Sequence, residues 1–285
     1  MLRRTLLAGL AAIALIGADK PAPTLTVMTL NVRLPVASDG PNYWPNRRAL
    51  FAQTVAAADP DLFGTQELFQ SQGDDIVRAL PQYRWFGRDR RGGHGDEHMG
   101  LFYRPDRLTL LDHGDFWLSD TPAVPGSISW GHTYPRMVNW GRFRTRDGHR
   151  FVALDTHFPY RDEDEPAREK AATLIAARLP TIARGDPVVL LGDFNTTPAT
   201  RTHAILTAAL KDAREQVATP RGPAETFHNF TGKPDRRIDW ILTRGFRVIS
   251  VETVTQHDGA LYPSDHFPVV AKLRFGADRR PRLSR

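Results

Sequence analysis

Residues 187–195 read PVVLLGDFN, a short apolar run that ends in a glycine, an acid and an amide. An uninterrupted apolar run of this kind is typical of a strand that is buried on both faces of a sheet. Asp193 and Asn195 follow directly after the strand, where side chains gather at the end of a sheet. This stretch therefore predicts both a buried central strand and the position of a candidate site.

Similar short apolar, β-rich runs recur along the chain, whereas helical patterns are few. The predicted strands are 25–32, 61–65, 83–87, 100–103, 108–112, 138–145, 151–157, 187–192, 238–243, 246–254 and 269–275, and the predicted helices are 47–58 and 165–183. The strands form two groups, and each group begins with a strand–helix unit. We therefore expect an α/β fold, a four-layer α/β sandwich of two packed, mostly antiparallel sheets with helices outside, in one domain over residues 19–276.

Composition and charge limit the classes of function. The 285 residues are 41% hydrophobic and 25% charged, as in an ordinary globular protein. The net charge is +6, but Arg3 and Arg4 account for +2 and the tail 277–285 for +3, which leaves +1 for residues 19–276. A nearly neutral body argues against a processive, sequence-independent DNA-binding protein. We expect the basic tail to be disordered rather than a binding arm.

The first 18 residues have the pattern of a signal peptide. Arg3 and Arg4 precede an apolar run over residues 6–16, which small residues follow. The run is shorter than the roughly 20 residues that a membrane-spanning helix needs. We therefore expect cleavage near Ala18, a periplasmic or secreted protein and no stable membrane insertion; the alternative is an uncleaved anchor. The absence of cysteine is compatible with either compartment.

Polar side chains also stand at the ends of the other apolar strands. Asn31 and Glu67 end the first two strands, Asp239 lies in RIDWI (237–241), and Asp265 with His266 precedes the last strand. Each of these residues alone is explained by turn chemistry. Together they form a group of hard oxygen ligands with one histidine, as a Mg²⁺ or Mn²⁺ site requires.

The order Asn, Glu, His, Asp-x-Asn, Asp, Asp-His resembles the endonuclease/exonuclease/phosphatase superfamily, which includes DNase I, deadenylases, inositol-polyphosphate phosphatases and bacterial sphingomyelinases. The resemblance covers residues 25–275, and its most specific segments are GDFN (192–195) and SDHFP (264–268). It implies a DNase I-like four-layer sandwich and hydrolysis of phosphoester bonds with a divalent metal. The segment FWLS (116–119) followed by Thr121-Pro122 resembles a bacterial branch near the deadenylase and nocturnin-type members.

The resemblance also implies roles for individual residues. Glu67, Asn31 and Asp265 correspond to the metal ligands of the family, for which we expect Mg²⁺ or Mn²⁺. Asp193 and Asn195 correspond to the pair that orients the attacking water and the phosphate. His266 corresponds to a histidine that binds the phosphate or helps to deprotonate water, and Asp239 to the carboxylate that orients its imidazole.

A second set of residues corresponds to the group that handles the leaving oxygen. His157 matches a histidine that acts as general acid, and Glu97 matches the acid that supports it. Arg136 stands at the position of an arginine near the substrate phosphate, a role that its fork of donors suits. For Glu97 the alternative is an exposed loop acid. Asp155, where many relatives carry asparagine, is a departure that affects the support of His157.

Three functions follow as hypotheses. The first is a phosphodiesterase, nuclease or phosphatase acting on nucleic acid, nucleotides or another small phosphate ester, with a 3′-to-5′ exonuclease as one form; Trp117 or Trp130 would stack on a base. The second is a sphingomyelinase-type phospholipid phosphodiesterase, for which residues 116–130, within the predicted loop 115–135, would engage the membrane. The third is a non-catalytic binding module. We expect a monomer in each case.

Overall fold

A computed structural model describes residues 24–276 of the chain. The predicted signal peptide 1–18 and the basic tail 277–285 lie outside the described residues. Between residues 24 and 276, none of the helices is long and apolar enough to cross a membrane.

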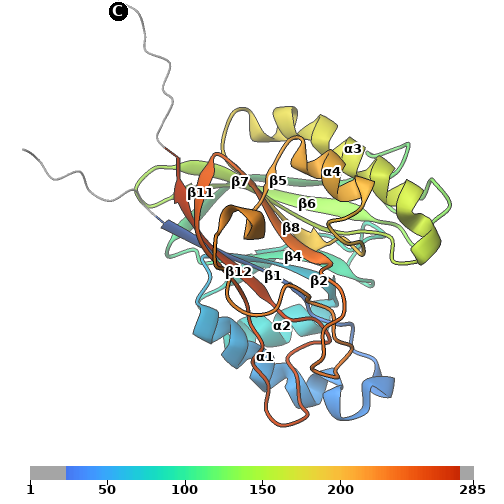
Figure 1. Cartoon of the computed structure of the whole chain (residues 1–285), viewed down its shortest axis with the longest axis vertical. Coiled ribbons are helices and arrows are strands. Elements are labelled where there is room, and N and C mark those ends of the chain that lie inside the picture. Colours follow the sequence, from blue (N-terminus) through green and yellow to red (C-terminus); the bar gives the residue numbers. More distant parts are fainter. Residues whose placement is uncertain (1–23, 277–285) are drawn as a thin grey trace, which may run out of the picture.

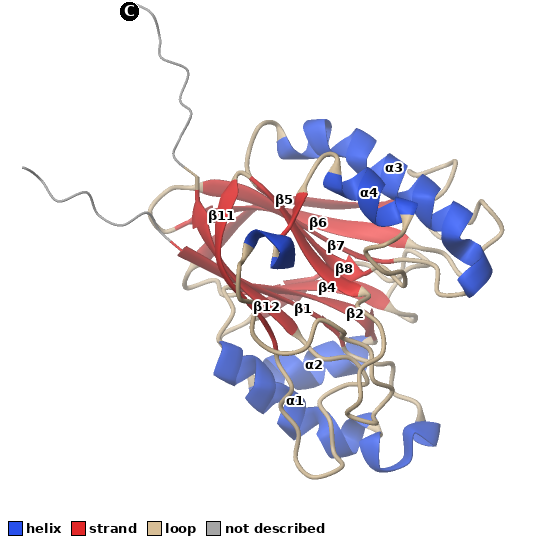
Figure 2. Ribbon diagram, viewed as in Figure 1, coloured by secondary structure: helices blue, strands red, loops and turns tan. Residues whose placement is uncertain are grey.

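Two six-stranded sheets form the centre of the protein, and Figures 1 and 2 show them packed face to face. The first sheet has the order β11-β12-β1-β2-β4-β3 and consists of β11 (Phe246–Thr253), β12 (Val269–Phe275), β1 (Thr24–Asn31), β2 (Leu62–Leu68), β4 (His98–Tyr103) and β3 (Arg84–Phe86). The second has the order β5-β6-β7-β8-β10-β9 and consists of β5 (Leu108–Trp117), β6 (Met137–Thr145), β7 (Arg150–His157), β8 (Val188–Asp193), β10 (Asp239–Arg244) and β9 (Lys211–Asp212).

The helices cover the outer faces of the two sheets. In Figure 2, α1 (Trp44–Ala58) and α2 (Gln70–Ala79) lie on one side, and α3 (Glu165–Ala183) and α4 (Arg201–Thr207) lie on the other. Short 3₁₀ helices complete the described elements: η1 (Ala37–Asn42), η2 (Asp162–Asp164) and η3 (Arg214–Gln216). The four layers confirm the predicted sandwich.

Strand pairing positions the ends of the strands. Between residues 24 and 276, β1 pairs with β2 and β7 pairs with β8 in parallel, and the other strand pairs are antiparallel. Because β7 and β8 run in the same direction, their carboxyl ends meet at one edge of the second sheet. β1 and β2 likewise bring their carboxyl ends together in the first sheet.

Three apolar clusters hold the layers together. One fills the space between the sheets, with Leu101, Ala153 and Leu191 fully buried. The other two join each sheet to its helices, as Phe51 of α1 and Ile175 of α3 illustrate. Burial of apolar surface stabilises proteins by about 25 cal/mol per Å², so these three interfaces fix the sheets relative to each other.

The structure departs from the sequence-based expectation at several elements. Helices α2 and α4 were not predicted, and α1 begins at Trp44 rather than Arg47. The expected loop 115–135 was wrong at its start, because β5 continues to Trp117. Phe116 and Trp117 are buried, and Trp117 Nε1 donates to the carbonyl of Arg90 over 2.6 Å. These two aromatic residues are therefore part of the core and are not available to a membrane or a base.

Candidate active site

Three adjacent strands of the second sheet place a row of polar residues at one edge. The strand register sets His157 of β7 opposite Asp193 of β8, and Asp193 opposite Asp239 of β10. All three side chains are buried. His157 Nε2 lies 3.5 Å from Asp193 Oδ2. The strands β7, β8 and β10 thus bring a histidine and two carboxylates together at one edge of the sheet.

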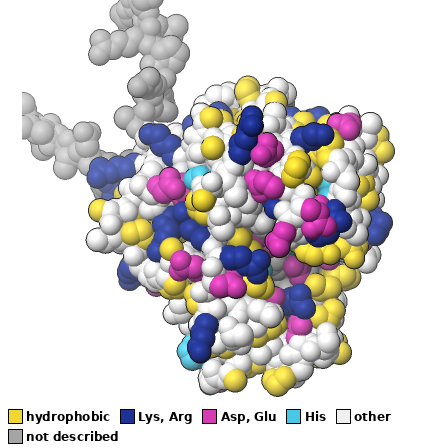
Figure 3. Space-filling model, turned by 45° about the vertical axis from the view of Figure 1, so that its right-hand side comes forward, with side chains coloured by type: hydrophobic (Ala, Val, Ile, Leu, Met, Phe, Trp, Pro, Cys, Tyr) yellow, Lys and Arg dark blue, Asp and Glu magenta, His cyan; other side chains and the backbone are white. Residues whose placement is uncertain are grey.

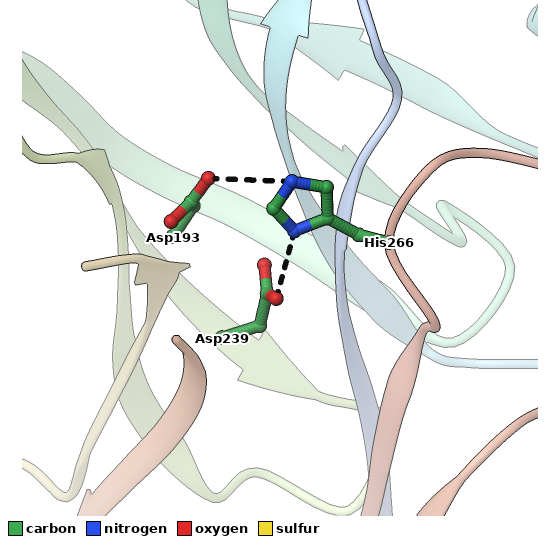
Figure 4. Close-up of side chains that lie close together, drawn as sticks. All are labelled: Asp193, Asp239 and His266. Carbon is green, nitrogen blue, oxygen red and sulfur yellow. Dashed lines mark hydrogen bonds and ion pairs between the residues drawn. The ribbon is translucent and has the colours of Figure 1, made fainter. Parts of the chain in front are cut away.

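His266 faces this row from the loop that precedes β12. Figure 4 shows its ring between two carboxylates, with Nδ1 2.9 Å from Asp239 Oδ2 and Nε2 3.8 Å from Asp193 Oδ2. Burial alone would lower the pKa of His266, but the charges of the nearby carboxylates and the hydrogen bond to Asp239 outweigh it and raise the pKa to about 10. His266 is therefore an imidazolium at neutral pH, and the expected contact with Asp239 is present.

Both oxygens of the Asp193 carboxylate accept hydrogen bonds. Its Oδ1 accepts the backbone N–H of Asn195 over 3.0 Å, and its Oδ2 accepts from Asn31 Nδ2 over 3.0 Å. Burial and then the charge of Asp239 raise the pKa of Asp193 to about 7. A carboxylate with a pKa near neutrality is suited to take up and release a proton.

The first sheet contributes Asn31 and Glu67. A bulge in β2 sets Glu67 in the left-handed region at φ 59°, a conformation that costs a non-glycine residue about 1–2 kcal/mol. Glu67 Oε2 accepts the N–H of Leu34, and Oε1 accepts Asn31 Nδ2 over 3.1 Å. The Asn31 side-chain oxygen accepts the N–H of Arg33. Asn31 therefore donates to both Glu67 and Asp193, and its own side-chain oxygen already accepts a hydrogen bond. The carboxylate oxygens are left as the main ligands for a cation.

Glu67 and Asp265 fit a hard divalent cation. Both line the same cavity. Burial raises the pKa of Asp265 above its usual value, against the lowering effect of His266, and the charge of Glu67 adds to the rise. A cation held between two such carboxylates would offset their repulsion. Asp193, Asp239 and His266 also bring ligand atoms within 4.8 Å of one another, but a protonated His266 that donates to Asp239 is a poor metal ligand.

The expected contact between Glu97 and His157 is absent, and this part of the prediction was wrong. Glu97 Oε2 lies 2.8 Å from Arg90 Nη1 instead, and the Glu97 side chain is buried rather than exposed in a loop. Among the described residues, His157 Nδ1 has no hydrogen-bond partner. Burial and the charges of Arg136 and Arg90 lower the pKa of His157 well below its usual value, so the imidazole is neutral in the free protein.

Asp155 lies behind the site, between the two sheets. Its Oδ1 accepts Gln66 Nε2 over 2.6 Å, and the side chain is fully buried. Burial raises the pKa of Asp155 well above its usual value, so this carboxyl is harder to ionise in the folded protein than in water. Asp155 therefore supports the packing of the sheets and does not contact His157 through any hydrogen bond within residues 24–276.

The side chains enclose a cavity of about 500 Å³. The predicted residues that line it are Glu67, Glu97, Arg136, His157, Asp193, Asn195, Asp265 and His266. Asn31 and Asp239 do not line the cavity; they lie behind the residues that do. Sequence analysis missed Arg90, Tyr134 and Tyr160, which lie in loops and also line the cavity. Neither Trp117 nor Trp130 does. The expected stacking role of Trp117 was wrong because this residue is buried, and that of Trp130 stays a prediction.

Charge on the outer surface is mixed. Figure 3 shows one face of the molecule, on which acidic and basic side chains are interspersed rather than gathered by sign. This distribution agrees with the small net charge of residues 19–276. A strong positive field of the kind that attracts long nucleic acid is not seen on this face.

Comparisons with known proteins agree with this geometry. The model of the Endonuclease/Exonuclease/phosphatase family matches residues 28–266. An endonuclease/exonuclease/phosphatase family protein from Bacteroides thetaiotaomicron is 33% identical, with a TM-score of 0.85 over 90% of this chain and 99% of that chain. A mannosyl-6-phosphatase from Bacteroides thetaiotaomicron VPI-5482 is 34% identical, with a TM-score of 0.83 over 88% of this chain and 100% of that chain.

More distant proteins share the fold. The human nocturnin catalytic domain has a TM-score of 0.71 at 19% identity, over 90% of this chain and 96% of that domain. Two uncharacterized proteins of Acanthamoeba polyphaga mimivirus are 28% and 23% identical over 54% and 83% of this chain. The chain spans 59% and 41% of the lengths of these two curated relatives.

Proposed function

This chain belongs to the endonuclease/exonuclease/phosphatase family, and from that starting point we propose that it is a metal-dependent phosphatase for small phosphate monoesters. The family establishes that it is a phosphoester hydrolase. The finer assignment rests on the cavity, whose charge and confined volume suit a doubly charged terminal phosphate better than a phosphodiester within a long strand.

The charge of the cavity is the observation that carries the proposal. Its lining side chains include four arginines, Arg33, Arg90, Arg136 and Arg236, and four carboxylates, Glu67, Glu97, Asp193 and Asp265. With the His266 imidazolium, which also lines the cavity, these charges sum to about +1, so a bound divalent cation would leave the lining with a charge of about +3. A phosphate monoester is a dianion near neutral pH, because its second pKa is about 6, whereas a diester carries one negative charge per phosphate. A lining of this charge therefore favours the dianionic monoester over the diester.

A divalent cation such as Mg²⁺ or Mn²⁺, held by Glu67 and Asp265, would polarise the phosphoryl oxygens and offset their charge. Arg136 and the His266 imidazolium would hold other phosphoryl oxygens. Arg136 is suited to this role because it is buried, and its Nη1 has no hydrogen-bond partner among residues 24–276. A buried guanidinium with a free donor is costly, and a bound phosphate would satisfy it.

Asp193 would accept a proton from water as the water oxygen attacks phosphorus. The bond between phosphorus and the alcohol oxygen breaks, and that oxygen needs a proton to leave as an alcohol. His157 Nε2 lies 3.5 Å from Asp193 Oδ2, so the proton removed from water can reach the leaving oxygen through His157. The products are orthophosphate and the alcohol. A bound dianion would also raise the pKa of His157, because it offsets the charges of Arg136 and Arg90.

The mannosyl-6-phosphatase at 34% identity supports a phosphatase over a nuclease. Nocturnin supports only the fold, because its identity is 19%. For the sphingomyelinase-type alternative, Phe116 and Trp117 are buried and give no support, whereas Val124 and Ile128 of the same segment are exposed.

A substrate panel tests the proposal, with orthophosphate measured for the monoesters and p-nitrophenol, released nucleotide or phosphocholine measured for the diesters. Purified protein with Mg²⁺ or Mn²⁺ is given mannose 6-phosphate, glycerol 1-phosphate, bis(p-nitrophenyl) phosphate, oligo(A) and sphingomyelin. We expect orthophosphate release from the two monoesters, with loss of activity in EDTA and in Asp193→Asn. Faster cleavage of the diester, of oligo(A) or of sphingomyelin than of either monoester would contradict the proposal.

A further inference from the structure

One wall of the cavity carries a cluster that the proposed chemistry does not use. Arg90, Glu97, Tyr134 and Tyr160 all line the cavity, and we refer to them as the Arg90 cluster. Arg90 Nη1 lies 2.8 Å from Glu97 Oε2, and its guanidinium carbon lies 4.5 Å from the centre of the Tyr134 ring. The rings of Tyr134 and Tyr160 stack at 28°, with centres 6.4 Å apart. The four side chains are therefore one contiguous assembly.

The cluster has a buried charged part and an open aromatic part. Arg90 and Glu97 are 7% and 8% exposed, whereas Tyr134 and Tyr160 are 37% and 52% exposed. The ion pair thus forms an inner wall of the cavity, and the two rings form its rim. Arg90 is held in place from a second direction, because its Nε lies 2.9 Å from Asp96 Oδ1. The wall therefore offers hydrogen-bond donors on Arg90, an acceptor on Glu97 and the apolar faces of the two tyrosine rings.

The two rings share the cavity with the residues of the proposed chemistry. His157, Arg136, Tyr134 and Tyr160 all line it, and Tyr160 is three residues after His157. Under the proposed function, His157 protonates the alcohol oxygen and Arg136 holds the phosphate. The alcohol part of the substrate then lies in the cavity that these two rings also line.

We propose that the Arg90 cluster is the subsite for the alcohol part of the substrate and that this alcohol is a polyhydroxylated ring, that is, a sugar. The proposal rests on the proposed function and names its substrate class. A sugar ring has an apolar C–H face that packs on tyrosine. Its hydroxyls are both donors and acceptors, and the Glu97–Arg90 pair offers one acceptor and several donors at one place. A nucleoside offers a base that stacks on the rings and a ribose diol that matches the ion pair, so a nucleoside 5′-phosphate is the competing substrate in the test.

The rings are tested by comparing a ring substrate with an acyclic one. In Tyr160→Ala we expect KM for mannose 6-phosphate to rise by roughly 3- to 10-fold, because the sugar ring loses its contact with one aromatic ring. KM for glycerol 1-phosphate and kcat for both substrates should not change. Tyr160→Phe is the matched control, because it keeps the ring and should retain the wild-type KM. Glu97→Gln should raise KM for mannose 6-phosphate relative to KM for glycerol 1-phosphate, because the change in lining charge is common to both substrates and only the sugar loses a hydroxyl contact.

Equal changes in KM for both substrates, or better hydrolysis of a nucleoside 5′-phosphate with a Tyr160-dependent KM, would overturn the sugar subsite. Failure of the proposed function gives a different result, because no monoester is then hydrolysed by the wild type. Calorimetric binding of mannose 6-phosphate to Asp193→Asn, with and without Tyr160→Ala, decides the subsite even then. Weaker binding in the double variant supports the subsite, and equal or absent binding refutes it.

Discussion

His266 donates a hydrogen bond from Nδ1 to Asp239 Oδ2 over 2.9 Å, and both side chains are buried. Asp239 fixes which nitrogen of the ring carries the hydrogen bond and stabilises the imidazolium, which leaves Nε2 directed at Asp193. The positive charge of His266, rather than its basicity, is therefore what the fold provides to the cavity.

Replacing Asp239 by asparagine tests this relationship. Asp239→Asn keeps the shape but removes the charge that raises the pKa of His266, so we expect this pKa to fall and kcat to drop by roughly 10²- to 10⁴-fold. Loss of activity should be steepest above the new pKa, where the ring is neutral. NMR titration of the His266 ring and a pH profile of kcat measure both effects. Asp115→Asn, which breaks the ion pair with Arg88 away from the cavity, is the control and should leave both unchanged.

The strained backbone at Glu67 leads to a second prediction. Glycine adopts a φ of 59° freely, whereas alanine does not. Glu67→Gly should therefore be more stable than Glu67→Ala by about 1 kcal/mol, although both lose the carboxylate and the metal-dependent activity. Urea denaturation of the two variants gives the difference directly, because the lost charge is common to both. Equal stabilities would show that the bulge relaxes when the side chain is removed.

Metal removal should change stability as well as activity. A cation between Glu67 and Asp265 binds only the folded chain, so it stabilises the protein by about 2.7 kcal/mol at a hundredfold excess over its dissociation constant. We expect EDTA to lower the melting temperature and Mn²⁺ to restore it in the wild type. Glu67→Gln should show a much smaller response. A melting temperature that is insensitive to Mn²⁺ in the wild type would argue against this site.

Sequence analysis predicted the strand ends well because strand pairing is regular. Once 187–192 is a buried strand next to 151–157, the register brings His157 and Asp193 together with little freedom. The partner of Glu97 was not predicted. An isolated antiparallel bridge between Asp89 and His98 and the hydrogen bond from the Arg90 N–H to the Glu97 carbonyl set Arg90 opposite Glu97, but the surrounding sequence has no strand pattern that marks this bridge. Tyr134 and Tyr160 lie in loops, where no strand pairing indicates the position of a side chain. Helix α2 escaped prediction because its sequence, QSQGDDIVRA, is polar and contains Gly73.

Close approach of the two sheets gives a prediction at Gly64. A Cβ atom at this residue would lie 2.5 Å from Asp155 Oδ1. Gly64→Ala should therefore force the sheets apart locally and destabilise the protein by about 1–3 kcal/mol. Gly95→Ala is the matched control, because a Cβ there meets no atom within 4 Å. Chemical denaturation of both variants checks the difference, and equal midpoints would contradict the predicted clash.

The raised pKa of Asp155 gives a prediction with a defined pH dependence. Its pKa is raised in the folded protein, so the unfolded chain loses this proton first as the pH rises above about 4. The contribution of Asp155 to the free energy of unfolding is therefore largest below about pH 4. It is lost as the pH rises from there toward the pKa of Asp155 in the folded protein. Asp155→Asn has no proton to lose. We expect the variant to be more stable than the wild type at pH 7 and the difference to shrink as the pH approaches 4. Denaturation midpoints measured across this range check it, and a difference that is constant with pH would show that Asp155 is ionised in the fold.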